Sequence, residues 1–507
     1  MDSSPPPPTP PRIPFAILLG IILGAAGYGW FIYSHGASYA GGSDSSGYMN
    51  SARLLAHGQF SQPVRTVPGL TPPGWNYYFY QSLGCNVDAE TGRMVPSYPI
   101  GLPLHIAIAA AAVGFEKAAR VINALNALAA GILLYALGRQ LGLARSWALA
   151  GTALLWASPI WIFQSLQPMS DAVATTWGLL AILGALRARN RLGWAATAGA
   201  AFALAMMVRP TSVMLIVPLL VALGGNWRVW SAFALGALPF AFGLGAYNFS
   251  VYGSIIESGY NHGGHNIFDA FEWQFFRPNL RHFAVWISQL LSPPIAILAV
   301  LGLPWLFQRS LRAGLLLVGW FLAFVALYSC YFCAGETWWY LRFLLPAFPA
   351  IIIVGLLAWQ RIFERLPDKT TWLAPTFLVV CLTWQYNLDR QLNVPSIRDE
   401  ERNYWLAGKW LREHAPSDAI LLTWQLSGAV LYYNTQPIVR WDLFQPSDFE
   451  LLRRTAARLH RPIYAPLFAF EEAEFHGKLF GPWLAVGHPG EVTIWLLSEP
   501  PATEVAR

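Results

Sequence analysis

Long apolar segments recur along most of the chain and predict helices that cross a membrane. The first covers residues 15–33, and ten more follow between residues 118 and 387. A helix needs about 20 apolar residues to cross the hydrocarbon core of a bilayer, and most of these segments approach that length. The predicted spans are residues 15–33, 118–138, 146–163, 172–186, 192–208, 210–225, 229–249, 283–307, 313–333, 342–360 and 371–387.

The composition agrees with an α-helical polytopic membrane protein. Of the 507 residues, 55% are hydrophobic and 12% are charged, whereas soluble proteins carry about 25% charged residues. The four cysteines form neither a disulfide framework nor a zinc motif, so we expect buried thiols. The formal charge of +6 says little about partners by itself, and we expect no nucleic-acid partner.

The segment at residues 100–114 is ambiguous because its apolar run is short and is broken by Pro103 and His105. Such a length suits an interfacial or re-entrant helix better than a span. The positive-inside rule favours eleven spans, because only then do most basic loop residues share the cytoplasmic side with Arg12. Those residues are Arg139, Arg145, Arg187, Arg189, Arg191, Arg228, Arg309, Arg312, Arg361, Arg365 and Lys369.

Three regions follow from this topology. Residues 1–14 are proline-rich and predict a disordered cytoplasmic tail. Residues 15–387 form the transmembrane region, with a first outer loop at 35–117. In residues 388–507 the patterns predict helices at 405–414 and 448–460 and strands at 419–424, near 463 and at 492–497. This alternation indicates a small soluble α/β domain with a partly parallel sheet on the outer face.

The stretch GGSDSSGY at residues 41–48 places a carboxylate close to the first span. Its Gly-Gly-Ser opening is a turn signal, and the spacing of Tyr48, Ala52 and Leu55 predicts a short helix that begins beside Asp44. Asp44 is then either an N-cap, whose side chain accepts N–H groups of the first turn, or a carboxylate held at the membrane surface for chemistry.

Other ionisable residues share the predicted outer face. Asp171 begins a span, where it either caps the helix or serves a site. Arg209 joins two spans and Arg342 precedes another. Each arginine either snorkels to the headgroups or pairs with a lipid phosphate in bidentate fashion. Glu336 lies in the loop before Arg342.

Two further outer segments carry less specific signals. Tyr98 opens YPIGLP at residues 98–103, whose prolines hold the chain extended and shape a cavity wall. His262 and His265, with Glu257 nearby, match no zinc motif, and the glycines between the histidines suggest a mobile loop. A divalent cation therefore stays open.

The order of these features resembles the GT-C superfamily of membrane glycosyltransferases, which includes protein O-mannosyltransferases and bacterial aminoarabinose transferases. The resemblance covers most of residues 15–387, and it depends on the order and sidedness of the motifs more than on any one of them. The matching stretches are SDSSGY at 43–48 with residues 52–58, YPIG at 98–101, Arg120 in AARVINAL, PMSD at 168–171, RPT at 209–211 and YLRFLLP at 340–346.

The resemblance implies transfer of a sugar from a polyprenyl-phosphate carrier to an acceptor hydroxyl on the outer face, usually with inversion. It matches Asp44 to the acidic residue that acts as catalytic base or supports the acceptor. Many relatives carry an acidic pair there, whereas Ser45 follows Asp44 here. Arg209 and Arg342 fall where relatives place cations near the carrier phosphate. The predicted donor- or substrate-binding residues are Tyr98, Arg120, Asp171, Arg209, Glu336 and Arg342.

The partners expected from this resemblance are a polyprenyl-phosphate sugar, membrane lipid, and a glycan, lipid or protein acceptor. The expected location is a bacterial inner membrane, with the N-terminus in the cytoplasm and the C-terminal domain outside. A transporter or flippase is the alternative, although the predicted spans contain almost no ionisable residues of the kind it would need. A membrane anchor that presents the C-terminal domain is a further alternative, for which eleven spans are excessive.

Overall fold

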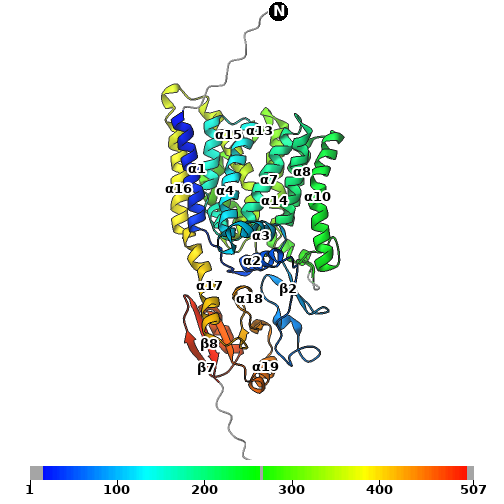
Figure 1. The fold of residues 1–507 in the computed structure, drawn as a ribbon. Helices are drawn as coiled ribbons and strands as arrows, with labels where there is room; N and C mark the ends of the chain where they lie inside the picture. Colours follow the sequence, from blue (N-terminus) through cyan, green and yellow to red (C-terminus); the bar gives the residue numbers. More distant parts are fainter. Residues whose placement is uncertain (1–14, 263–265, 499–507) are drawn as a thin grey trace, which may run out of the picture.

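The computed structural model describes residues 15–262 and 266–498, which form a helical bundle with a smaller α/β region at one end (Figure 1). The predicted tail at residues 1–14 and His265 lie outside the described residues. The helices of the bundle are α1 (Phe15–His35), α4 (Phe115–Gln140), α5 (Arg145–Trp156), α6 (Pro159–Ser165), α7 (Ser170–Arg187), α8 (Leu192–Val208), η2 (Pro210–Leu215), α9 (Ile216–Leu223), α10 (Trp227–Tyr252), α11 (Phe276–Leu291), α12 (Pro293–Leu301), α13 (Leu303–Arg309), α14 (Leu311–Tyr328), η6 (Trp338–Ala347), α15 (Phe348–Phe363) and α16 (Leu373–Gln391).

Every predicted span is helical over most of its length, but not every one is a single long helix. Within the described residues, five helices are long and apolar enough to cross a membrane, and up to seven spans result if each bent pair counts as one. Three further apolar helices are shorter. The protein is therefore a multi-pass membrane protein, and the count of eleven spans stays a prediction.

Two of the predicted spans are sharply bent. Residues 146–163 form α5 and α6, which are bent by 62°, and residues 283–307 form parts of α11, α12 and α13, with a 114° bend between α11 and α12. Prolines cause both breaks, because a proline disfavours helical backbone in the residue before it. Pro159 begins α6, and Pro293 and Pro294 begin α12 after Ser292, whose φ is 74°.

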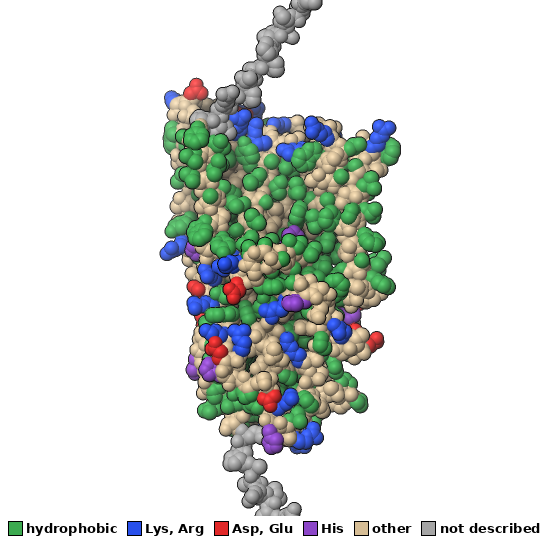
Figure 2. Space-filling view, in the orientation of Figure 1, with side chains coloured by type: hydrophobic (Ala, Val, Ile, Leu, Met, Phe, Trp, Pro, Cys, Tyr) green, Lys and Arg blue, Asp and Glu red, His purple; other side chains and the backbone are tan. Residues whose placement is uncertain are grey.

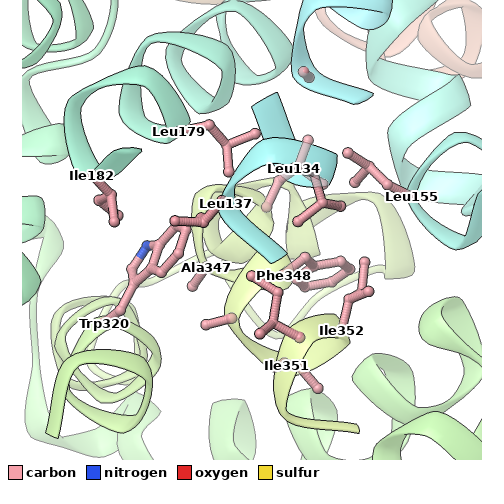
Figure 3. Packing of buried hydrophobic residues seen from close by; sticks show 14 of the residues in the cluster. Leu134, Leu137, Leu155, Leu179, Ile182, Trp320, Ala347, Phe348, Ile351 and Ile352 are labelled. Carbon is pink, nitrogen blue, oxygen red and sulfur yellow. The ribbon is translucent and has the colours of Figure 1, made fainter. Parts of the chain in front are cut away.

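One apolar core runs through the bundle (Figure 3). It brings together Leu134 and Leu137 of α4, Leu179 of α7, Trp320 of α14 and Phe348 of α15, none of which is more than 1% exposed. Other apolar side chains point outward and cover the sides of the bundle (Figure 2). An exposed apolar surface of this extent indicates contact with lipid.

Close contact between α8 and α10 depends on small residues. A Cβ atom added to Gly199 would lie 1.8 Å from the carbonyl oxygen of Phe233, and one added to Gly236 would lie 2.0 Å from the carbonyl oxygen of Ala196. Small residues let helix backbones approach in this way inside membranes. The interface therefore excludes any larger side chain at both positions.

Two short helices lie across the end of the bundle that faces the α/β region (Figure 1). They are α2 (Ser43–Ala56) and α3 (Gly101–Val113), and we call this the sheet end of the bundle. The 13 residues of α3 extend over about 20 Å at 1.5 Å per residue, which is shorter than a bilayer core. The short helix that the sequence indicates here is present, and the expectation that it does not cross the membrane stays a prediction.

The C-terminal α/β region contains a five-stranded sheet in the order β5-β4-β6-β8-β7. Strand β4 pairs in parallel with β5 and β6, whereas β8 pairs antiparallel with β6 and β7. The predicted partly parallel sheet is present, although β5, β7, α18 and α20 were not predicted. The bounds are β4 (Ile420–Leu422), β5 (Ile438–Val439), β6 (Ile463–Phe468), β7 (Trp483–Gly487), β8 (Val492–Leu497), α17 (Ile397–His414), α18 (Ser427–Tyr433), α19 (Pro446–Leu459) and α20 (Ala469–Lys478).

The first loop packs against this region and shares its core. Trp75, Phe79 and Tyr80 belong to the same buried cluster as Trp441 and Phe444. The loop also forms a three-stranded sheet that was not predicted, in the order β1-β3-β2, with β1 (Gln62–Pro63), β2 (Cys85–Asp88) and β3 (Arg93–Pro96). Segments more than 300 residues apart therefore form one layer over α2.

Candidate active site

The two acidic residues predicted at helix starts do not cap their helices. The N-cap of α2 is Gly42 and that of α7 is Met169, and neither helix has a side-chain cap hydrogen bond. Asp44 and Asp171 each occupy the second position of their helix instead. The capping interpretation is therefore wrong for both, although each negative charge still suits the positive end of a helix dipole.

Each of these carboxylates forms an ion pair with an arginine from a distant segment. Asp44 Oδ2 lies 2.7 Å from Arg342 Nη1, and Asp171 Oδ1 pairs with Arg209 Nη1. Asp171 is fully buried, whereas the Asp44 side chain is 25% exposed and that of Arg342 is 15% exposed. Asp44 is thus the more accessible carboxylate, whereas Arg209, 14% exposed, and Arg342 are equally accessible.

Phe343 and Met169 connect the two ion pairs. The guanidinium carbons of Arg209 and Arg342 each lie 5.2 Å from the centroid of the Phe343 ring, within the range of cation–π attraction. Met169 Sδ lies 3.9 Å from Arg342 Nη1 and 3.9 Å from Ser45 Oγ. The four charged residues therefore form one cluster at the sheet end of the bundle.

Tyrosines complete the wall of this cluster. Tyr98 Oη lies 2.8 Å from Ser43 Oγ, and Tyr48 donates a 2.9 Å hydrogen bond to Ser170 Oγ. The rings of Tyr48 and Tyr98 have centroids 5.1 Å apart. Tyr98, which was predicted to form a cavity wall, thus lies beside Asp44.

The charged surroundings determine the ionisation of Asp44. Burial by itself would raise the pKa of its carboxyl, but the Arg342 charge and a hydrogen bond from Tyr98 outweigh burial and hold the pKa below its ordinary value. Burial and the Asp44 charge raise the pKa of Tyr98 well above its ordinary value. At neutral pH Asp44 is therefore a carboxylate and Tyr98 a neutral hydrogen-bond donor.

In the described part of the chain, two buried polar atoms of the cluster lack hydrogen-bond partners. Among the described residues, Asp171 Oδ2 and Arg342 Nε are buried and have no hydrogen-bond partner. A buried polar group without a partner costs free energy. A bound ligand that places an anionic oxygen at Arg342 would remove part of this cost.

Two predicted residues lie outside the cluster. Arg120 of α4 stands 5.1 Å from the centroid of the Tyr33 ring and contacts the connection after α1. Glu336 is exposed in the loop before η6, where its charge acts on Cys333 and Tyr340. Neither has a described contact with Asp44, Asp171 or Arg209, so their binding roles stay predictions.

The described residues contain no group of three His, Cys, Asp or Glu side chains that could hold a metal ion. His262 instead contacts Glu257, with Nδ1 to Oε1 at 2.9 Å. A cation bound jointly by protein and substrate phosphate stays an untested expectation.

Glu401 of α17 lies close to the cluster, although the sequence did not predict it as a site residue. It lies against Gly41 and Gly42, at the start of the helix that carries Asp44. The pattern of α17 marks it only as one acidic residue in the run Asp399, Glu400, Glu401. Nothing local to the sequence distinguishes it, because its surroundings come from the first loop.

Comparisons with known proteins agree with this fold. Residues 97–244 match the sequence-family model described as dolichyl-phosphate-mannose-protein mannosyltransferase. A search of curated protein sequences finds no match. ArnT from Cupriavidus metallidurans, solved bound to undecaprenyl phosphate, is similar in structure with a TM-score of 0.58 and 13% identity, over 94% of this chain and 98% of ArnT.

Two other solved structures extend the comparison. AglB from Archaeoglobus fulgidus, an oligosaccharyltransferase in complex with an inhibitory peptide and a dolichol-phosphate, has a TM-score of 0.54 and 12% identity, over 88% of this chain and 69% of AglB. The arabinofuranosyltransferase AftD from Mycobacteria has a TM-score of 0.57 and 13% identity, over 95% of this chain and 40% of AftD. All three are GT-C glycosyltransferases, so the resemblance inferred from the sequence is confirmed at the level of the fold.

Proposed function

We propose that this chain, which has the GT-C fold, is a glycosyltransferase that moves a sugar from a polyprenyl-phosphate carrier to an acceptor hydroxyl. The Asp44–Arg342 pair is the observation that carries this proposal. It combines a carboxylate that can accept a proton with a guanidinium that can hold a phosphate, and both are accessible at the sheet end of a membrane bundle.

The reaction assigns a role to each partner of the pair. The acceptor oxygen attacks the anomeric carbon as the bond from that carbon to the carrier phosphate breaks, which gives inversion. The proton of the hydroxyl passes to Asp44, a contribution of about 10²- to 10⁴-fold in rate for general base catalysis. Arg342, with Arg209 behind it, stabilises the negative charge that develops on the leaving polyprenyl phosphate.

The pairing of Asp44 with Arg342 also couples donor binding to base strength. While Arg342 pairs with Asp44, the pKa of Asp44 is lowered and its carboxylate is a weak base. A donor phosphate competes for Arg342 because guanidinium pairs well with phosphate oxygens. Its negative charge and the loss of the ion pair raise the pKa of Asp44, so the base gains strength when the donor is bound.

The membrane setting is part of the proposal. We place the N-terminus in the cytoplasm, keep the prediction of eleven spans, and place the sheet end with Asp44 on the outer face of an inner membrane, because the basic loops then lie inside. The spans provide an apolar surface for an isoprenoid tail. The α/β region, described over residues 388–498, lies over the cluster, and we assign it the selection of the acceptor, whether protein, lipid or glycan.

The decisive experiment measures release of polyprenyl phosphate by the purified protein in lipid. Labelled polyprenyl-phosphate sugars serve as donors and a crude membrane extract as acceptor. The wild type should turn over one donor, and Asp44→Asn should lose turnover by at least about 10²-fold while it stays folded and inserted. Glu90→Gln, an exposed acid in the same loop, is the matched control and should keep full activity.

Three other outcomes would change the proposed base, the proposed function or the metal requirement. Retained turnover in Asp44→Asn would remove Asp44 as the base. No turnover with any donor by a folded wild type would overturn the transferase and favour a transporter or flippase. Loss of turnover on chelation, restored by a divalent cation, would add a metal to the donor phosphate site.

A further inference from the structure

Glu401 is a buried carboxyl group that the proposed reaction does not use directly. It belongs to α17 of the α/β region and is 7% exposed. Its Oε1 accepts a long hydrogen bond of 3.4 Å from the Gly42 N–H, and its Oε2 has no partner among the described residues. A Cβ atom on Gly41 would lie 1.8 Å from that Oε2, so the Glu401 carboxyl group packs directly against the chain at Gly41.

This position matters because Gly42 is the N-cap of α2. Helix starts leave their first N–H groups without partners inside the helix, and no side chain of the first loop caps α2. Glu401 supplies an acceptor and negative charge at this end from more than 350 residues away in the sequence. Asp44 lies two residues after the N-cap, so the placement of the first turn determines where its carboxylate stands.

Helix α18 of the same region forms two further hydrogen bonds, one with the chain just before α2 and one with α2 itself. The Ala40 N–H donates a 2.9 Å hydrogen bond to Tyr433 Oη of α18, and Asn50 Nδ2 donates one of 2.9 Å to the Gly428 carbonyl. A Cβ atom on Gly428 would lie 2.0 Å from Ser46 Oγ. Helices α17 and α18 therefore contact α2 at its start and along its first turns.

We propose that Glu401 is a positioning residue, through which the α/β region holds the first turn of α2 so that Asp44 faces Arg342. This inference rests on the proposed function for its effect on catalysis, but not for the contact itself. It gives the α/β region a part in the chemistry beyond selection of an acceptor.

Glu401 also brings a titratable charge close to the base. The groups that face it are Asp44 on α2, Glu400 and Tyr404 on its own helix, and Tyr433 on α18. Burial first, and the negative charges of Glu400 and Asp44 to a smaller extent, raise the pKa of Glu401 to about 7. Around neutral pH Glu401 therefore gains a negative charge in addition to that of Asp44.

Two variants separate position from charge. Glu401→Ala removes the acceptor at Gly42, so amide hydrogen exchange in residues 43–47 should quicken about fivefold, as for loss of a helix cap. The kcat should fall by a similar factor while donor affinity stays unchanged. Glu401→Gln keeps an acceptor of the same length, so it should restore most of the kcat at pH 7 but lose the wild-type inflection in kcat near that pH.

Glu471→Gln is the matched control. Glu471 is another buried carboxyl of the α/β region, 1% exposed and with its pKa also raised to about 7 by burial, but it caps α20 and lies against Gln425. This variant should leave both the exchange in α2 and the pH profile unchanged.

The inference fails if Glu401→Ala keeps wild-type exchange and kcat, or if the inflection near pH 7 persists in Glu401→Gln. If Glu401→Ala does not fold, the pH profile of Glu401→Gln still decides. If the wild type shows no turnover at all, the proposed function fails, and hydrogen exchange alone still tests the contact with α2.

Discussion

Asp44 and Asp171 follow serines at helix starts, where the local pattern fits either a helix cap or a carboxylate that serves a site. The structure decides for ion pairs, because the arginines that neutralise these carboxylates come from segments about 40 residues away for Asp171 and 300 for Asp44. Two pairs of opposite charge stabilise each other in a buried setting. The residue types pointed to a site, but the pairing needed the fold.

At this scale Arg342 offers the sharpest test of donor binding. Arg342→Ala should weaken binding of polyprenyl phosphate by about 10- to 100-fold, because a hydrogen bond to a charged group contributes about 1.5–3 kcal/mol. Binding of a labelled carrier to protein in lipid nanodiscs measures this. Arg361→Ala removes a more exposed arginine near the C-terminal end of α15; this variant serves as control and should bind normally.

Arg209 has to be tested with a variant that keeps its positive charge. Asp171 is fully buried, and removal of its ion-pair partner would leave an unpaired buried charge, which costs about 3–5 kcal/mol. Arg209→Lys keeps the charge but loses the planar fork, so it should fold and still bind the carrier less tightly. Unchanged affinity in both Arg342→Ala and Arg209→Lys would exclude these arginines from the donor site.

Among the elements, α2 depends most on what surrounds it. Its 14 residues form a helix too short to be stable alone in water. It lies between α3 on one side and α18 on the other, and its interior glycine permits a close approach. Tyr98 packs directly over Gly47, where a Cβ atom would lie 2.4 Å from its ring.

Gly47→Ala should therefore disturb the site although alanine favours a helix. The added methyl displaces Tyr98 from Ser43 and weakens the hydrogen bond that Tyr98 donates to Asp44, so turnover should fall by about tenfold, which corresponds to about 1.4 kcal/mol. Gly20→Ala in α1, with open space around the position, is the control. Equal activity in the two variants would contradict the close packing of Tyr98 on α2.

The element boundaries also show where apolar patterns mislead. The run at residues 283–307 has the length and hydropathy of a span, yet Pro293 and Pro294 break it and the chain turns by 114°. Hydropathy averages over a window and does not register a backbone break. Residues 100–114 contain the short helix α3, and the expectation that they do not cross depends on their length and on their effect on loop charges as well as on hydropathy.

For the whole molecule, the bundle and the α/β region meet over α2 and function as one unit in the proposal. The first loop contributes to the core of the α/β region, so that region is not an appendage. Buried carboxyl groups on α17 and α20 make its stability sensitive to pH.

The direction of this pH dependence follows from two raised pKa values. Glu401 and Glu471 have pKa values of about 7 in the folded protein, above the ordinary 4.5. Between about pH 4.5 and 7 the folded form keeps protons that the unfolded chain has released, so stability falls as the pH rises through this window. Above about pH 7 both forms are ionised and the loss is complete.

Thermal unfolding of the detergent-solubilised protein measures this effect. The Tm should fall between pH 5 and pH 8, by about 2–4 °C for each kcal/mol. The double variant Glu401→Gln/Glu471→Gln should lose much of that slope, since neither position then carries a proton to release. An identical slope in wild type and double variant would contradict the raised pKa values.

The sequence by itself determined the membrane class, the apolar helices, the short α3 and a partly parallel C-terminal sheet, because hydropathy, loop charge and strand alternation are local properties. It also singled out Asp44, Tyr98, Asp171, Arg209 and Arg342, whose types and positions at helix ends are unusual beside a bilayer. Only the tertiary structure decided that these five meet in one cluster, that Arg120 and Glu336 lie apart from it, and that Glu401 reaches α2. Those relations depend on contacts between segments far apart in the chain, and no local pattern encodes which distant side chain neutralises a buried charge.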